Sequence, residues 1–147
     1  MKTVFVGQQP NSHADEGVAL PIRPGSTGQK LVSMMDVTPD EFYHHFIRVN
    51  VSPIHDPEGF TPSYHHHHAR NMLPLLEGRH VVLLGPAVAS AFDLKEFMYC
   101  RFYDHPVCHL LWAVIPHPSG LNRLYNDPDV KRRVEELLRY VWEIRDV

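Results

Sequence analysis

The stretch HVVLLGP, residues 80–86, predicts a short buried β-strand that stops at a glycine and a proline. Ala87–Phe92 follows with the small and apolar residues of a helix that packs on a sheet. A second apolar run, LLWAVI at residues 110–115, predicts another buried strand that ends at Pro116. Short apolar strands that alternate with helices indicate a mainly parallel sheet with both faces covered.

Two more strands are expected toward the N-terminus, at Lys2–Val6 and Phe46–Val51. Residues 38–41, Thr-Pro-Asp-Glu, predict a helix start because they combine a cap, a first-turn proline and an acidic residue three positions after the cap. Residues 126–128, Asn-Asp-Pro, predict the start of a long final helix with one apolar stripe. We therefore expect a single α/β domain over residues 1–147, built as a three-layer α/β/α sandwich around a central, mainly parallel sheet.

The composition suits a packed domain but gives no strong sign of a nucleic-acid partner. The chain has 147 residues, 44% of them hydrophobic, and 14 basic against 17 acidic residues give a formal net charge of −3. A nucleic-acid binder usually has a basic excess, although a small footprint can rest on backbone amides and hydroxyls instead. The chain has two cysteines, and we predict no signal peptide at its N-terminus, which favours a cytoplasmic protein. It has no apolar run long enough to span a membrane, so we expect no membrane partner, and we expect a monomer.

Histidine is unusually frequent, with twelve residues, of which His65–His68 are consecutive. Thr61-Pro62 can open a helix through this run, so it predicts a solvated loop or the first turn of a helix. Four adjacent side chains point in different directions and cannot all bind one ion. A metal site in this run is the alternative to that interpretation, but the chemistry described below uses a neutral imidazole and amides, so we expect no metal and no cofactor.

Polar motifs follow three of the predicted strands. They are Gly-Gln-Gln-Pro-Asn at residues 7–11, Asn50, and His-Pro-Ser at residues 117–119. In a parallel sheet the carboxyl ends of the strands lie at one edge, and ligands bind in the crevice beyond them. The residues alone therefore predict a binding site at which Gly7, Asn50 and His117 converge.

These motifs also carry a family resemblance. VFVGQQPN at residues 4–11 resembles the first motif of uracil-DNA glycosylases, and FIRVNVSP at residues 46–53 resembles their strand with a base-reading asparagine. HVVLLGPAVASAF at residues 80–92 is similar to the strand, glycine and small-residue helix of several branches, and VIPHPSGLNR at residues 114–123 resembles the last motif. The motifs stand in the family's order. The resemblance implies that the protein flips a base out of single- or double-stranded DNA and hydrolyses its N-glycosidic bond.

The resemblance assigns roles in the chemistry. As the bond breaks, negative charge develops on the departing base, and a neutral His117 would stabilise that charge with a hydrogen bond. Asn50 would read the base, because its amide offers a donor and an acceptor side by side. Backbone amides after Gly7 would also meet the base, since glycine allows close approach. For each side chain the plainer alternative is a residue that only holds a turn.

The same resemblance implies a surface that grips DNA. Ser52 and Ser119 would contact the phosphates that flank the flipped nucleotide. Leu121, in the loop Gly120-Leu121-Asn122-Arg123, would fill the space that the base leaves, and Arg123 would contact phosphate. The alternative for Leu121 is ordinary packing in the core.

The chain also departs from the family pattern. The water-positioning acid of the first motif is replaced by Gln8 and Gln9, which cannot act as a general base but could orient water, with Gln9 expected at the water-positioning site. The nearest carboxylates, Asp15 and Glu16, lie in the following loop and could substitute for the acid. The aromatic ring that stacks on the base has only Leu20 as a counterpart. Asn11 stands where the best-known branch has a tyrosine that rejects thymine, so a larger or hydrophilic group on the base could enter. The iron–sulfur branches need four cysteines, which this chain lacks.

Three functions remain open at this point. The preferred hypothesis is a monofunctional glycosylase for uracil or a 5-substituted pyrimidine in DNA. The second is a catalytically weak or inactive binding module of the same fold, because the carboxylate is missing from the motif. The third is a hydrolase of free nucleotides or nucleosides, or a nucleobase-exchange enzyme, which would suit an acidic chain. Outside these three, the alternative is an unrelated α/β enzyme.

Overall fold

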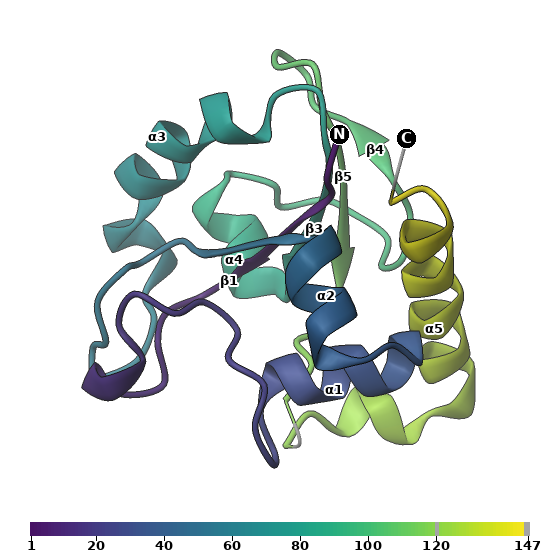
Figure 1. Ribbon diagram of the computed structural model, residues 1–147. Coiled ribbons are helices and arrows are strands. Elements are labelled where there is room, and N and C mark those ends of the chain that lie inside the picture. Colours follow the sequence, from purple (N-terminus) through teal and green to yellow (C-terminus); the bar gives the residue numbers. More distant parts are fainter. Residues whose placement is uncertain (120, 146–147) are drawn as a thin grey trace.

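The computed structural model describes residues 1–119 and 121–145 of the chain. A central sheet of five strands has the order β2-β1-β3-β5-β4 (Figure 1). Its strands are β1 (Val4–Gly7), β2 (Ile47–Asn50), β3 (His80–Leu84), β4 (Tyr103–Asp104) and β5 (Leu111–Ile115). Neighbouring strands among β2, β1, β3 and β5 pair in parallel, and β4 adds an antiparallel edge. The protein is therefore an α/β protein with a mostly parallel sheet, as the sequence predicts.

In the described part of the chain, five α-helices pack on the two faces of the sheet: α1 (Thr27–Met35), α2 (Pro39–His45), α3 (His66–Leu76), α4 (Pro86–Ala91) and α5 (Pro128–Glu143). Their starts follow the capping signals in the sequence. Thr38 and Glu41 form the complete capping box of α2, with Pro39 in the first turn. The side chain of Asp127 caps α5 by accepting a hydrogen bond from the amide of Asp129.

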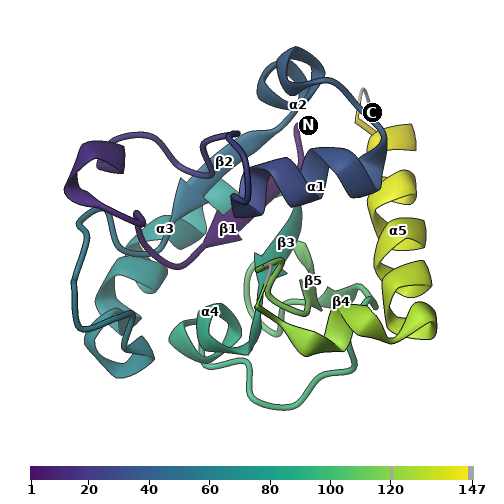
Figure 2. The same ribbon diagram turned by 90° about the horizontal axis from the view of Figure 1, so that it is seen from below.

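The strands alternate their side chains between two buried clusters. Phe5, Val82 and Ile115 join apolar residues of α1, α2 and α5 in the first cluster. Val6 and Leu83, from the intervening strand positions, join residues of α3 and α4 in the second. Figures 1 and 2 show α1, α2 and α5 on one side of the strands and α3 and α4 on the other.

Among the described residues, the connections contain three short 3₁₀ helices: η1 (His13–Asp15), η2 (Pro62–Tyr64) and η3 (Arg123–Asn126). The histidine run follows η2, and His66 begins α3, in agreement with a run at the first turn of a helix. Strand β4 was not predicted, because two residues carry no recognisable periodicity. Within the described residues, no helix is long and apolar enough to cross a membrane.

The register of the sheet places its carboxyl-terminal edge. Gly7 pairs with Asn50, and Leu84 pairs with Ile115, so four parallel strands end at one level. His117 stands two residues beyond the end of β5. The polar motifs thus leave the sheet at the same edge, which is where a parallel sheet offers its ligand crevice.

Candidate functional site

A cavity of about 280 Å³ opens at this edge of the sheet. Its volume is close to the lower end of the 300–1,000 Å³ that is usual for small-molecule sites, so it suits a ligand of the size of one base or nucleoside. Its lining brings together Gly7, Gln8, Gln9, Pro10, Asn11, Leu20, Pro21, Ser26, Thr27, Gly28, Asn50, His55, Asp56, Pro57, Gly59, Phe60, Leu84 and His117. The expected convergence of Gly7, Asn50 and His117 is therefore present.

Gly7 and Asn50 are paired neighbours on strands β1 and β2. A Cβ atom at Gly7 would lie 2.6 Å from Oδ1 of Asn50 and 3.1 Å from Cδ2 of Leu20. Only the absence of a side chain at Gly7 lets the Asn50 amide lie over strand β1. That amide has no hydrogen-bond partner among the residues that the structure describes, so its donor and acceptor are available to a ligand.

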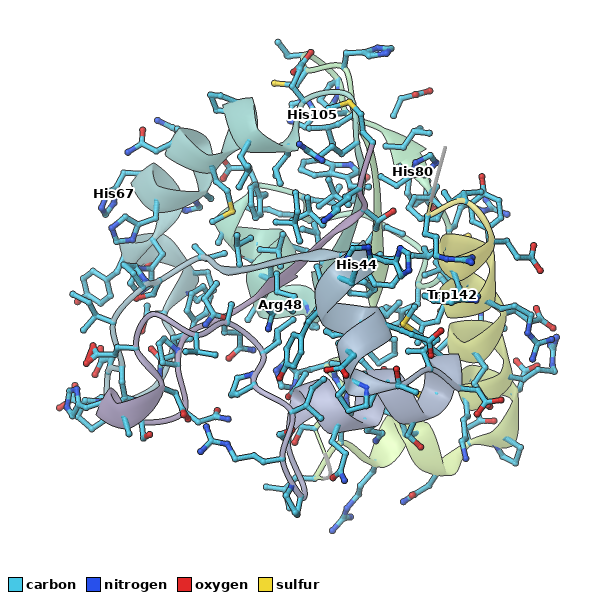
Figure 3. The ribbon with its side chains drawn as sticks, viewed as in Figure 1. His44, Arg48, His67, His80, His105 and Trp142 are labelled. Atoms are coloured by element: carbon cyan, nitrogen blue, oxygen red, sulfur yellow. The ribbon has the colours of Figure 1, made fainter. Side chains whose placement is uncertain are left out.

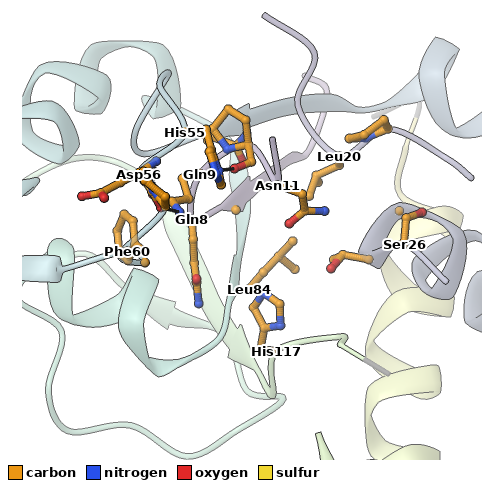
Figure 4. A pocket seen from close by; sticks show the side chains of 18 residues that line it. Gln8, Gln9, Asn11, Leu20, Ser26, His55, Asp56, Phe60, Leu84 and His117 are labelled. Carbon is orange, nitrogen blue, oxygen red and sulfur yellow. Dashed lines mark hydrogen bonds between the residues drawn. The ribbon is translucent and has the colours of Figure 1, made fainter. Parts of the chain in front are cut away.

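His117 reaches the cavity from the end of β5, beside Leu84 (Figure 4). Gly85 has a positive φ of 100°, and a Cβ there would lie 3.0 Å from Cβ of His117, so the glycine allows the two segments to pack closely. Burial lowers the pKa of His117, and the positive charge of Lys30 lowers it further. The imidazole is therefore neutral at pH 7 and can donate one hydrogen bond without carrying a charge.

Leu20 covers the cavity from the long loop after β1, as Figure 4 shows. It has a positive φ of 51°, which is strained for a leucine, and is 7% exposed. Arg48, which is labelled in Figure 3, holds this loop by donating to the carbonyl of Ala19, and the hydroxyl of Tyr43 accepts a hydrogen bond from the amide of Ile22. The strained backbone is thus fixed from two sides, and a leucine rather than an aromatic ring forms this wall.

The beginning of α1 forms a further part of the wall. Ser26 caps this helix by accepting from the amide of Gln29, while Thr27 and Gly28 line the cavity. A Cβ at Gly28 would lie 2.6 Å from the carbonyl oxygen of Leu20, so glycine is needed for the loop to approach. The first amides of a helix lack intrahelical partners and carry a partial positive charge, which favours an anion in the cavity.

Of the two glutamines in the first motif, only Gln9 forms side-chain hydrogen bonds to other described residues. Its Nε2 donates to the carbonyl of Asp56 at 2.9 Å, and its Oε1 accepts the amide of Asp56 at 3.4 Å. These two hydrogen bonds connect the loop after β1 to the loop after β2, so Gln9 has a structural role. Gln8 lines the same cavity without a side-chain partner among the described residues, so it is the glutamine that can orient a water molecule.

Asp15 and Glu16 do not line the cavity. Asp15 is buried in an ion pair with Arg23, and the hydrogen bond from Arg23 is the main cause of its lowered pKa. Glu16 accepts the amide of His55 at 3.2 Å and lies 3.0 Å from Nδ1 of His13, which lowers the pKa of Glu16. Both carboxylates hold the loop together, and Asp56 is the carboxylate found in the lining.

Sequence reasoning missed the contribution of the loop after β2. Its residues His55, Asp56 and Phe60 line the cavity, but a turn-rich stretch without periodicity gave no sign of this. Nδ1 of His55 lies 2.8 Å from the carbonyl oxygen of Pro10. Because the carbonyl can only accept, Nδ1 carries a proton, and in the neutral ring Nε2 is the nitrogen with a lone pair. The ring of Phe60 stacks on His65, with centroids 5.0 Å apart.

The expected DNA-contacting residues lie in different settings. Leu121 is 92% exposed, so it does not pack in the core. Its backbone amide donates to the hydroxyl of Ser119, and the side-chain amide of Asn122 donates to the carbonyl of His117, which ties this loop to the cavity. Arg123 is exposed at the start of η3.

Ser52 and Gly120 complete the set of expected contacts. Ser52 is 3% exposed, and its hydroxyl donates to the carbonyl of Ile54. This geometry favours a role in the turn rather than contact with a phosphate. Gly120 lies outside the described residues.

The chemistry that the site offers is that of hydrogen bonds and a neutral imidazole. In the part of the chain that the structure describes, no group of three His, Cys, Asp or Glu side chains is placed to hold a metal ion.

Comparison with models of known protein families gives no match for the chain, and a search of curated proteins finds no similar sequence.

Proposed function

We propose that this protein is a DNA glycosylase of the uracil-DNA glycosylase kind, with helices and sheet arranged as a three-layer α/β/α sandwich. It would remove uracil or a 5-substituted pyrimidine from a nucleotide flipped into the cavity. The observation that supports this most is the meeting of Gly7, Asn50 and His117 in one cavity of nucleobase size. The fully exposed Leu121, on a loop bonded to His117, supports a surface that enters the duplex.

The departing base would be stabilised from two directions. A base that leaves with its electron pair carries negative charge on its oxygens, and neutral His117 donates a hydrogen bond to that charge. The amides of Thr27 and Gly28 at the start of α1 add a partial positive charge on the cavity wall. Asn50 distinguishes uracil from cytosine, because its amide pairs with a carbonyl oxygen and a ring N–H side by side.

Water would be oriented without a carboxylate in the first motif. Gln8 has a free amide in the lining, and Nε2 of His55 has a lone pair that can accept a proton from water. Gln9 is excluded from this role in our proposal, because both ends of its amide are bonded to Asp56. A transition state in which the base has largely departed needs only this modest activation.

A second candidate is a binding module that holds a flipped base without cleaving it. The observation that favours it is the position of Asp15 and Glu16, which are bonded to other residues and do not line the cavity, so neither takes the place of the acid that is missing from the first motif. Such a module would bind damaged DNA through the same Asn50 and Leu121 but release no base.

The two candidates separate in one assay. Single- and double-stranded oligonucleotides carrying uracil, hydroxymethyluracil, hypoxanthine, xanthine or mismatched thymine are incubated with the protein, and alkali then cleaves any abasic site. A glycosylase gives cleavage at uracil or a 5-substituted pyrimidine, and His117→Ala loses it. Retention of the oligonucleotides without cleavage of any of them establishes the binding module instead.

A further inference from the structure

Beside the candidate pocket, a second depression of about 360 Å³ lies along α1 and is bordered by Lys131 of α5. Its lining consists of Gly25, Ser26, Gln29, Lys30, Ser33, Met34 and Lys131. Ser26 lines this depression and the candidate pocket alike, so the two spaces adjoin. Figures 1 and 2 both show α1 and α5 side by side.

The depression gathers positive charge without a counter-charge. Lys30 and Lys131 come from different helices, and no carboxylate is part of the lining. Neither lysine forms an ion pair with any residue that the structure describes. Partial burial lowers the pKa of Lys30, and the positive charge of Lys131 lowers it further. Two like charges that face one space favour an anion between them.

The other donors of the depression suit phosphate oxygens. The hydroxyl of Ser33 and the amide nitrogen of Gln29 are available, since Oε1 of Gln29 already accepts the amide of Gly25. Lys30 also reaches the segment that follows His117, because its Nζ lies 3.4 Å from the carbonyl oxygen of Ser119 and 3.9 Å from the centre of the Tyr125 ring. An anion here lies next to the ligand of the candidate pocket.

We propose that Lys30 and Lys131 bind a phosphate group of the nucleotide strand whose base enters the candidate pocket. This inference rests on the proposed function for the identity of the ligand. The shared chemistry is a phosphate oxygen, supplied either by the phosphodiester of a DNA strand or by the terminal phosphate of a mononucleotide. Because the depression adjoins the pocket through Ser26, one nucleotide can occupy both.

The test uses the variant Lys131→Gln. Lys131 is exposed on α5 and does not line the candidate pocket. Lys95→Gln is the matched control, because Lys95 is exposed beyond α4 and the change in net charge is the same. Binding of a fluorescent single-stranded oligonucleotide with one uracil is measured from 50 to 200 mM salt. Loss of one phosphate contact lowers the slope of log affinity against log salt by about 0.7. The defect of Lys131→Gln should therefore shrink about 2.6-fold over this range.

A slope that changes in Lys131→Gln but not in Lys95→Gln supports the proposal, and equal slopes in both variants overturn it. If the wild-type protein binds no oligonucleotide, the DNA part of the proposed function fails separately. Deoxyuridine monophosphate and inorganic phosphate, titrated against ¹⁵N-labelled protein, then decide. Saturable amide shifts at Ser33 and Lys131 that disappear in Lys131→Gln support the phosphate site, and their absence in the wild type overturns it.

Discussion

Replacing Gly7 with alanine should damage the candidate site through a single contact. Gly7 does not have a positive φ, so alanine adds no backbone strain there. Its Cβ, however, would lie 2.6 Å from Oδ1 of Asn50, about 0.8 Å closer than ordinary contact allows. The Asn50 amide must therefore move by about this distance. A misplacement on the order of 1 Å costs about 10²-fold in rate when the displaced group positions the substrate.

The assay is base release from a uracil-containing oligonucleotide with the protein in excess, so that one turnover is observed. Asn50→Ala provides the control, because it removes the atom that Gly7→Ala would displace. We expect Gly7→Ala to slow release about 10²-fold in the wild-type chain and to have little additional effect in the Asn50→Ala variant. A thermal unfolding measurement checks that each variant is folded. An unchanged rate in a folded Gly7→Ala variant, or an equal loss in both backgrounds, would refute the reasoning.

Three further predictions follow from the contacts of the site. Because burial lowers the pKa of His117, the acid limb of the rate profile should have its midpoint below pH 6.5, and His117→Ala should abolish this limb and slow release by roughly 10²–10⁴-fold. Because the pKa of His117 is lower in the folded chain than in the unfolded chain, the unfolded chain binds more protons below pH 6.5. The free energy of unfolding should therefore decrease as the pH is lowered below 6.5, and it should decrease less in His117→Ala, as urea titrations measure. Leu121→Ala should slow release from duplex DNA at least about tenfold and from single strands much less, because only a duplex has a gap to fill; equal losses on both substrates would contradict this. Gln9→Ala should lower the free energy of unfolding by about 1–2 kcal/mol, whereas Gln8→Ala should leave it unchanged and slow release, and the reverse pattern would exchange their roles.

The main elements could be predicted because local chemistry determines them. The buried strands β3 and β5 are continuous apolar runs, and the starts of α2 and α5 have their caps in the sequence. Strand β4 could not be predicted, since its two residues are defined only by their pairing with β5.

The candidate site was predictable to the extent that it lies at strand ends. Gly7, Asn50 and His117 meet because the parallel register brings the ends of their strands to one level. The position of His55 and Phe60 depends on how a turn-rich loop folds back over β1, and no periodicity encodes that. The bond between Gln9 and Asp56 joins residues 47 positions apart, so only the folded chain reveals it.

The preference between uracil and cytosine in the Asn50→Asp variant tests the account most directly. A protonated carboxyl group donates to the ring nitrogen of cytosine and accepts from its amino group, whereas the Asn50 amide suits uracil. Mass spectrometry of the bases released from matched oligonucleotides measures the ratio. The account predicts that the wild-type protein releases uracil and not cytosine, and that Asn50→Asp lowers uracil release and raises cytosine release. A ratio that is the same in the wild type and in Asn50→Asp would contradict the claim that this cavity reads a flipped base.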